Sequence, residues 1–359
     1  MATVRRDSHE RGLPSLNQAR EERRRAFVLG KARMPAIPPH FWLWTAVGIS
    51  AFGILYWRIA QGQIESARSA VMAKQRAMTV ALGPKLFPFR DRVEGWAREL
   101  AADWPGNFVA PDADLAKLRN SASVYLRLRI ADAKQAKELR KAAQSSLRDG
   151  FTSCLFVSRA KGDPTVGPQC RTIGDCASGL LCNEWGVCAE PVQPYNLRLA
   201  YRTLRVLSSE WTDEVHQATS ELGLSAYERD LDNVAKRDVP VTLELLSRSK
   251  YFTLVLDEDP PGGLPAEIPD AGETPAERLQ RVGHFARVGI WDLATGNPVL
   301  RLRAEADGEF VMLGRKTAQS EASLAAQHRQ VNNCELALRV REALGGEPGA
   351  APPTAAPAQ

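Results

Sequence analysis

Histidine is scarce in this sequence, and the motifs of metal and hydrolase chemistry are missing. The 359 residues include five histidines, of which only His216, His284 and His328 follow residue 60. They form no His-Glu-x-x-His zinc spacing, and the chain has neither a Gly-x-Ser-x-Gly nucleophile elbow nor a glycine-rich phosphate loop. We therefore predict no catalytic residue, no metal site and no cofactor, and we expect structural or surface roles for the three histidines.

Excess positive charge is also missing from most of the chain. Residues 41–359 hold 38 basic and 38 acidic side chains, whereas residues 1–40 hold nine basic and four acidic ones. A body without surplus cations cannot neutralise phosphates, so we exclude nucleic acid as its partner. The basic cluster at residues 20–25 is either a solvated, disordered arm or a contact with anionic lipid.

Two further shortages concern the origin of the protein. No Asn-x-Ser/Thr acceptor occurs, so nothing points to a glycosylated secretory protein of a eukaryote. Lysine is scarce as well, with 11 residues against 36 arginines, a bias typical of GC-rich bacterial genomes. We interpret the chain as bacterial.

One long apolar run is present. Residues 41–60 read "FWLWTAVGISAFGILYWRIA" and carry no charge through Trp57. Twenty helical residues span about 30 Å, the thickness of the hydrocarbon core of a bilayer. Residues that favour a membrane interface flank the run: Trp42, Trp44, Tyr56, Trp57 and Arg58. The alternative is a buried core helix, but we predict a transmembrane signal anchor that contacts membrane lipid.

The orientation of this anchor follows from charge and cysteine content. The run is longer than the roughly 7–15 apolar residues of a cleaved signal peptide. Residues 21–40 carry five basic side chains and residues 58–78 carry four, so only the full N-terminal tail gives a positive-inside signal. Cysteines clustered after the span suit an oxidising compartment. We expect a single-pass protein of the bacterial inner membrane, with a cytoplasmic N-terminus and a periplasmic bulk.

Four of the six cysteines are separated by five residues each: Cys170, Cys176, Cys182 and Cys188. Zinc sites bring cysteines in closer pairs, and a Cys-x-x-Cys redox pair is absent. We predict two disulfides within this segment and leave its three possible connectivities open. The remaining two, Cys154 and Cys334, either form a third bridge or stay free as buried thiols.

This segment resembles a known module. The residues that carry the likeness are Cys170, Asp175, Cys176, Gly179, Cys182, Gly186 and Cys188. Their pattern resembles the Dickkopf N-terminal cysteine-rich pattern, of the kind found in short repeats of exported bacterial proteins. Dickkopf proteins carry more cysteines in that region, so receptor antagonism is not implied. The resemblance implies an extracytoplasmic binding or spacer module.

The chain divides into five regions by composition and periodicity. We expect a disordered basic tail over 1–40, the anchor over 41–60, and juxtamembrane helices over 61–110 that break at Pro84 and Pro88. An extracytoplasmic domain follows over 111–345 and carries a cysteine-rich insertion at 165–192. A disordered tail over 346–359 ends the sequence.

Within the extracytoplasmic domain, the patterns alternate between strand and helix. A strand at 123–130, a helix at 131–150 and a buried strand at 151–158 predict a βαβ unit with parallel strands. After the insertion, we expect a long helix over 197–222, two shorter helices and a strand at 251–257. An acidic loop, a hairpin over 285–306 and a helix over 318–344 complete the order. This order predicts an α/β or α+β domain built on a mixed sheet.

Two local patterns offer chemistry but fall short of a site. Ser247-x-x-Lys250 has the spacing of serine acyl-enzymes but lacks their partner motifs. The acidic loop offers oxygen ligands between Asp257 and Glu273, but not at the spacing of a calcium loop. We predict a non-enzymatic envelope protein that presents its domain to a protein partner for binding or assembly. The alternative is an envelope enzyme, either a serine hydrolase or an oxidoreductase.

Overall fold

The computed structural model describes residues 39–156, 167–177, 180–182, 186–189, 195–269, 271–308 and 320–345, together with positions 20, 21 and 24. The chain forms two compact units, an N-terminal unit over Met1–Glu65 and a C-terminal unit over Ser66–Gln359. The tails predicted over 1–40 and 346–359 lie almost entirely outside the described residues.

The apolar run of the N-terminal unit is helical and exposed. It belongs to helix α2, Pro39–Ala101, and the large apolar side chains from Phe41 to Ile59 are each at least half exposed. Among the described residues, this helix is the one long and apolar enough to cross a membrane. The run therefore has the length and composition of a span.

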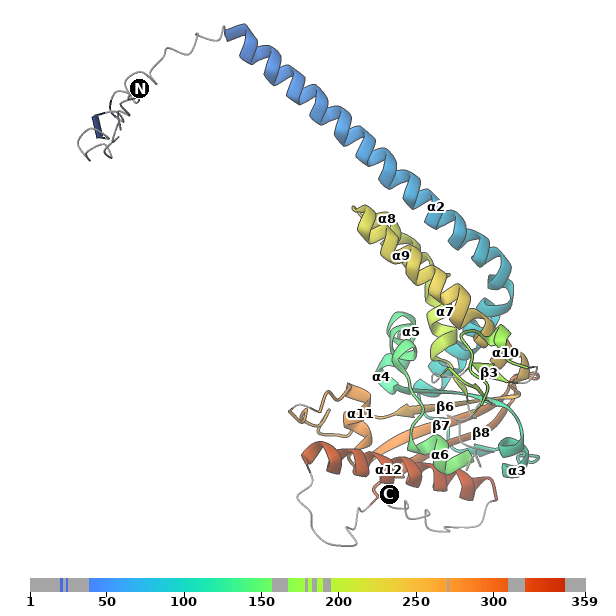
Figure 1. Ribbon diagram of the computed structural model, residues 1–359. Helices are drawn as coiled ribbons and strands as arrows, with labels where there is room; N and C mark the ends of the chain where they lie inside the picture. Colours follow the sequence, from blue (N-terminus) through green and yellow to red (C-terminus); the bar gives the residue numbers. More distant parts are fainter. Residues whose placement is uncertain are drawn as a thin grey trace, which may run out of the picture. The chain divides into compact units, whose positions relative to one another are not determined.

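The prediction that Pro84 and Pro88 break the helix is wrong, because α2 continues through both. An interior proline removes one backbone hydrogen bond and bends a helix. Figure 1 shows α2 curving in its C-terminal third. Packing beyond the prolines offsets the cost, since Leu86, Val93 and Leu100 are buried in the C-terminal unit. Most of the region predicted as juxtamembrane helices, residues 61–110, lies in the same compact unit as the sheet, since that unit begins at Ser66.

The C-terminal unit is built on a six-stranded mixed sheet, which confirms the predicted mixed sheet. Its spatial order is β1 (Phe108–Val109), β8 (Pro298–Ala306), β7 (His284–Asp292), β6 (Tyr251–Asp257), β2 (Ser123–Arg129) and β5 (Tyr195–Asn196). Strand β2 pairs in parallel with β5 and β6, and the other neighbours are antiparallel. Helices and strands are arranged as an α+β unit.

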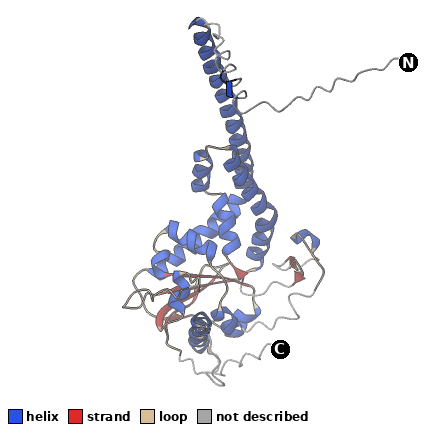
Figure 2. Ribbon diagram, turned by 60° about the vertical axis from the view of Figure 1, so that its left-hand side comes forward, coloured by secondary structure: helices blue, strands red, loops and turns tan. Residues whose placement is uncertain are grey.

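Helices cover both faces of this sheet (Figures 1 and 2). One face carries α3 (Leu115–Asn120), α6 (Gly150–Phe156) and α12 (Glu321–Ala343). The other face carries the end of α2, α5 (Ala136–Ser145), α7 (Arg198–Val206) and α10 (Val239–Arg248). On this second face Trp96 of α2 stacks on Trp291 and Phe252, with ring centroids 5.3 and 5.9 Å apart. Six of the seven residues of β2 are buried as a result.

Several elements appear as predicted. Strand β6, the β7–β8 hairpin and helix α12 confirm the third strand, the hairpin and the closing helix. The hairpin turn uses Gly296, whose φ of +78° lies in the left-handed region that glycine adopts without strain. Asp292 stabilises the same turn, because its Oδ1 accepts from the backbone N–H groups of Ala294 and Thr295.

The predicted strand at 151–158 is wrong, because residues 150–156 form helix α6. A short apolar run fits a strand or a buried helix equally well, and the preceding residue decides here. The Asp149 carboxylate caps the first turn, because its Oδ1 accepts from the Thr152 backbone N–H at 3.4 Å. Phe151 and Leu155, four residues apart, are then buried together against α12. The parallel partners of β2 are therefore β5 and β6.

Two predicted helices are interrupted. The helix expected over 131–150 is split into α4 (Ile130–Ala133) and α5. The helix expected over 197–222 is split into α7 and α8 (Ser209–Gln217), because the Ser208 hydroxyl accepts from the Trp211 N–H and starts a new helix. Helix α9 (Glu221–Asn233), a π-helical turn at Val234–Asp238 and α10 follow.

Candidate functional site

A buried arginine lies at the centre of the sheet. Arg127 of β2 has a side chain only 3% exposed, and it shares a face with Tyr125 because strand residues two apart point the same way. Its Nε and Nη2 donate to the two carboxylate oxygens of Asp257 at 2.9 and 2.7 Å. Asp257 ends β6, directly opposite Arg129 in the parallel register. The pair is bidentate, the strongest geometry for an arginine and a carboxylate.

His284 extends this pair. The imidazole is fully buried at the start of β7, with Nε2 3.0 Å from Asp257 Oδ1 and Nδ1 2.9 Å from the Val282 carbonyl oxygen. The imidazole therefore lies between two acceptors, the Asp257 carboxylate and the Val282 carbonyl.

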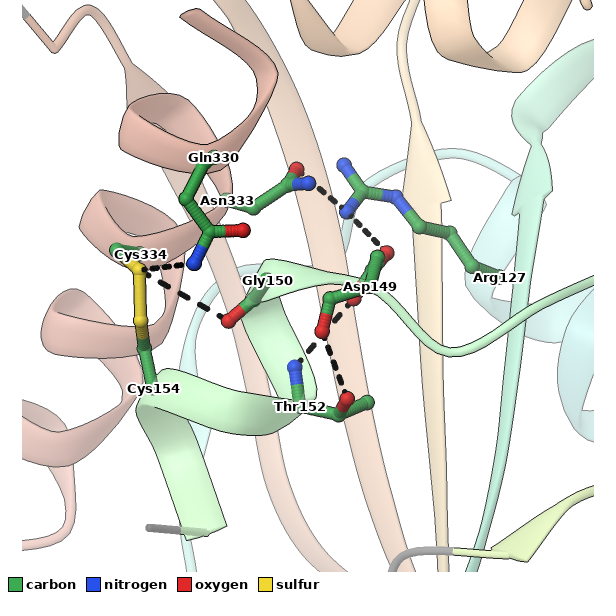
Figure 3. Close-up of a disulfide and its surroundings, with 8 residues drawn as sticks. All are labelled: Arg127, Asp149, Gly150, Thr152, Cys154, Gln330, Asn333 and Cys334. Atoms are coloured by element: carbon green, nitrogen blue, oxygen red, sulfur yellow. Dashed lines mark hydrogen bonds and ion pairs between the residues drawn. A yellow bond between two sulfur atoms is a disulfide. The ribbon is translucent and has the colours of Figure 1, made fainter. Parts of the chain in front are cut away.

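Asp149 and Asn333 connect the arginine to helices α6 and α12 (Figure 3). Arg127 Nη1 donates to Asp149 Oδ2 and to Asn333 Oδ1, each at 2.7 Å. Tyr125 also donates to Asp149 Oδ2, at 3.0 Å. Asp149 directly precedes α6 and Asn333 lies in α12, so one side chain ties β2 to both helices. We call Arg127, Asp149, Asp257, His284 and Asn333 the Arg127 cluster.

Ion pairing offsets the effect of burial on the pKa values of Asp257 and Arg127. Burial works to raise the pKa of Asp257, but the charges and hydrogen bonds of Arg127 and His284 lower it to about 2. Burial disfavours the charged guanidinium, yet Asp257 and Asp149 raise the pKa of Arg127. Burial and the charge of Asp149 raise the pKa of Tyr125, which stays a neutral donor. Arg127 and Asp257 therefore form a charged pair at neutral pH.

A pocket of about 450 Å³ opens beside the cluster at the carboxyl end of β2. This is the end of a parallel strand at which open α/β sheets bind ligands. Its lining includes four cations and four carboxylates: Arg127, Arg129, Lys141, Arg148, Asp132, Asp149, Glu138 and Glu277. Burial lowers the pKa of Arg148 and raises that of Asp132. Because cations and carboxylates are equal in number, the pocket favours a polar ligand that carries no net charge.

The hydroxyl groups of this pocket already have structural partners. Ser146 Oγ accepts from the Arg127 N–H and from Asn196, both at 3.3 Å. Thr274 forms the capping box of α11, Pro275–Gln280, with Glu277. Ser145 donates to the Ala142 carbonyl at 2.9 Å. These bonds fix the pocket walls and engage all three hydroxyls within the C-terminal unit.

The two local patterns of the sequence take structural roles. Ser247 lies in the last turn of α10 and donates to the Glu244 carbonyl at 2.8 Å. Lys250 follows the C-cap Ser249, whose backbone is extended, so the pair does not share a helical face.

Three described carboxylates of the acidic loop, Glu258, Asp259 and Glu273, form ion pairs with arginines. Glu258 binds Arg287 and Arg303, at 2.6 and 2.8 Å. Asp259 binds Arg129 at 3.0 Å. The remaining pairs of the loop join Glu273 to Arg281 and Arg329. Carboxylates engaged in this way hold the loop to the sheet and are not grouped for a cation.

The cysteine-rich segment forms two bridges, Cys170–Cys182 and Cys176–Cys188, with Cα atoms 5.8 and 5.4 Å apart. The first thiol is thus joined to the third and the second to the fourth, one of the three connectivities that the sequence allowed. Cys182 and Cys188 are opposite each other in the small hairpin of β3 (Leu181–Cys182) and β4 (Cys188–Ala189). Three sulfur atoms, of Cys170, Cys176 and Cys188, lie within 4.8 Å of one another and could bind a metal ion only after reduction.

A third bridge joins Cys154 of α6 to Cys334 of α12, with Cα atoms 5.2 Å apart (Figure 3). It lies next to the Arg127 cluster, since Asn333 precedes Cys334 in α12. Of the two alternatives left open by the sequence, the structure contains the bridge.

Comparison with known proteins adds no relative. No protein-family model, curated protein or solved structure matches the chain. The site is therefore defined by its own geometry.

Sequence reasoning missed the Arg127 cluster. Arg127 was not among the candidate site residues, and Asp257 was grouped with the carboxylates of the acidic loop. One signal was available in the sequence. Asp257 directly follows the apolar run "YFTLVL", so its carboxylate lies next to the strand that pairs with β6. His284 was expected to be structural, and the structure buries it as a partner of Asp257.

Proposed function

We propose that this protein is a single-pass envelope protein that holds an α+β unit outside the cytoplasm for binding or assembly. Residues 41–60 form the anchor in this proposal, with Trp42 and Trp44 at one interface and Tyr56, Trp57 and Arg58 at the other. The observation that carries it is the exposed apolar run from Phe41 to Ile59 in a chain with three disulfides. Exposed apolar surface of this length is stable in lipid, and disulfides persist in oxidising compartments.

A binding role is supported by the polar groups around Arg127 in the C-terminal unit, which are engaged with one another. Arg127 is paired with both carboxylates of its cluster, and the nearby hydroxyls serve as helix caps and backbone ties. Such groups stabilise a scaffold rather than activate a substrate. The cysteine-rich segment adds a small crosslinked module that resembles those of exported proteins.

The topology can be tested with two reporters fused after Gln359. An alkaline phosphatase, which is active only outside the cytoplasm, should be active, and a green fluorescent protein exported by the same route should be dark. Deleting residues 41–60 is the matched control and should reverse both signals. A fluorescent fusion of the intact chain with an inactive phosphatase would refute the proposed orientation, and release of the intact chain by alkaline carbonate would refute the anchor.

A further inference from the structure

The pocket beside the Arg127 cluster carries three charged side chains that have no ion-pair partner in the described part of the chain. Glu138 and Lys141 lie one turn apart on α5, and Arg148 lies between α5 and α6. None of the three forms a side-chain hydrogen bond with another described residue. Their side chains are within reach of a ligand, since Lys141 and Arg148 are exposed and Glu138 is partly exposed. The pocket therefore offers charges of both signs to a ligand.

These charges are separated along the pocket, which α4, α5 and α11 border (Figure 1). The carboxylates are Asp132 of α4 and Glu138 in the first turn of α5. Burial and, to a smaller extent, the charge of Glu138 raise the pKa of Asp132, so the two carboxylates are neighbours. A helix rises about 1.5 Å per residue, so Ser145 lies about 10 Å from Glu138 along α5, and Arg148 follows it. The pocket therefore has an acidic end and a cationic end, with Lys141 between them.

Apolar side chains also line this pocket. Ala142 lies on α5 between the two ends, Leu147 directly precedes Arg148, and Pro275 and Ala276 begin α11. The side chain of Leu147 is 59% exposed, so its apolar surface meets water unless a ligand covers it. Because the hydroxyl groups of the lining are engaged within the protein, recognition depends on the charges and on this apolar surface.

We propose that this pocket binds a zwitterion of dipeptide size with an apolar side chain. The ammonium group of the ligand binds Glu138 and Asp132, and its carboxylate binds Arg148. Two extended residues span about 7 Å, which places the two charged termini near opposite ends of the pocket. A volume of about 450 Å³ is typical of a small-molecule site. This inference names a ligand class for the binding role proposed above, and it does not depend on the anchor or its orientation.

Blocked dipeptides separate the two ends of the pocket. Alanyl-phenylalanine, titrated calorimetrically at pH 7 into the full-length chain in an uncharged detergent, should bind saturably with a Kd below about 1 mM. Its N-acetyl form lacks the ammonium group and its C-terminal amide lacks the carboxylate. Each should bind about tenfold more weakly, the effect of one hydrogen bond to a charged group, and the doubly blocked form should bind more weakly still. Free phenylalanine should also bind more weakly, because its two charges are too close to reach both ends.

Two variants assign the ends to residues. Arg148→Gln should weaken binding of the free dipeptide about tenfold and leave binding of the amide unchanged, because the amide has no carboxylate. Glu138→Gln should weaken the free dipeptide in the same way and leave the N-acetyl form unchanged. Lys137→Gln is the matched control, since Lys137 lies on α5 outside the lining, and it should bind as the wild type does.

Several results would each overturn the proposal. They are the absence of saturable binding of alanyl-phenylalanine, equal binding of the doubly blocked form, and unchanged binding by Arg148→Gln or Glu138→Gln. Equal binding of free phenylalanine would overturn the dipeptide size. The blocked dipeptides test the wild-type chain alone, so they decide the matter even where a variant fails to unfold cooperatively in urea.

Discussion

Replacing Arg127 with methionine should strongly destabilise the C-terminal unit. The substitution removes four hydrogen bonds of 2.7–2.9 Å and leaves Asp257 fully buried, with His284 as its remaining side-chain partner. Removing one partner of a buried ion pair typically costs about 3–5 kcal/mol, because the other charge stays in a medium of low dielectric. Methionine fills a similar volume, so the loss reports on charge rather than on a cavity.

The free energy of unfolding of the full-length chain in mild detergent, measured with urea and tryptophan fluorescence, tests this value. Arg339→Met is the matched control, because Arg339 is 52% exposed and lies 3.3 Å from Glu335 on the same helix. That surface pair should contribute less than about 1 kcal/mol. The double variant Arg127→Met/Asp257→Asn should lose less than the sum of the single losses, since it leaves no unpaired carboxylate at position 257. A loss for Arg127→Met as small as that for Arg339→Met, or strict additivity, would refute the reasoning.

Three further outcomes are expected. Asp257 has a pKa lowered to about 2, so its contribution to stability is complete above about pH 4 and is lost as the pH falls to about 2. The free energy of unfolding from urea titrations should fall by about 2 kcal/mol over that range, and that of Asp257→Asn should not. Replacing residues 165–192 with a Gly/Ser linker should leave the unfolding of the C-terminal unit cooperative. A broadened unfolding transition would show that the cysteine-rich segment is part of the core. Cys154→Ala/Cys334→Ala should reduce stability by up to about 5 kcal/mol, since the bridge closes 180 residues; an unchanged urea midpoint would contradict this.

The elements that the sequence predicted are those whose local pattern agrees with their packing. Strand β6 and the β7–β8 hairpin combine apolar runs with a Gly-containing turn, and α12 is long enough to be unambiguous. The run "FTSCLFVS" lacks such a signal, because its helical form depends on Asp149 before it and on α12 behind it. Ser208 is a second case in which tertiary structure decides. From the sequence it looks like an exposed position of one long helix, whereas in the structure it is the N-cap of α8.

The Arg127 cluster was out of reach for a different reason. Its hydrogen bonds join Arg127 to residues 22, 130 and 206 positions away in the sequence. Periodicity reports the environment of one segment, whereas these contacts depend on which strands are neighbours. Because helices cover both faces of the sheet, the polar side of β2 is as buried as its apolar side. The alternating pattern therefore predicted the strand correctly, but it did not show that Arg127 is buried.

The Arg127 cluster and the Cys154–Cys334 bridge tie the same two helices together. Asp149 precedes α6 and Asn333 precedes Cys334 in α12, and Arg127 binds both. These ionic contacts hold the two helices at a Cα separation, 5.2 Å, within the range that a disulfide needs. We therefore predict that Arg127→Met lowers the fraction of Cys154–Cys334 crosslink formed during oxidative refolding of the full-length chain, measured by peptide mapping after alkylation. The two bridges of the cysteine-rich segment are the internal control, because each closes a short loop that does not involve Arg127 and should form as in the wild type. An equal yield and rate of the Cys154–Cys334 crosslink in the variant would show that α6 and α12 are brought together by their apolar contacts alone.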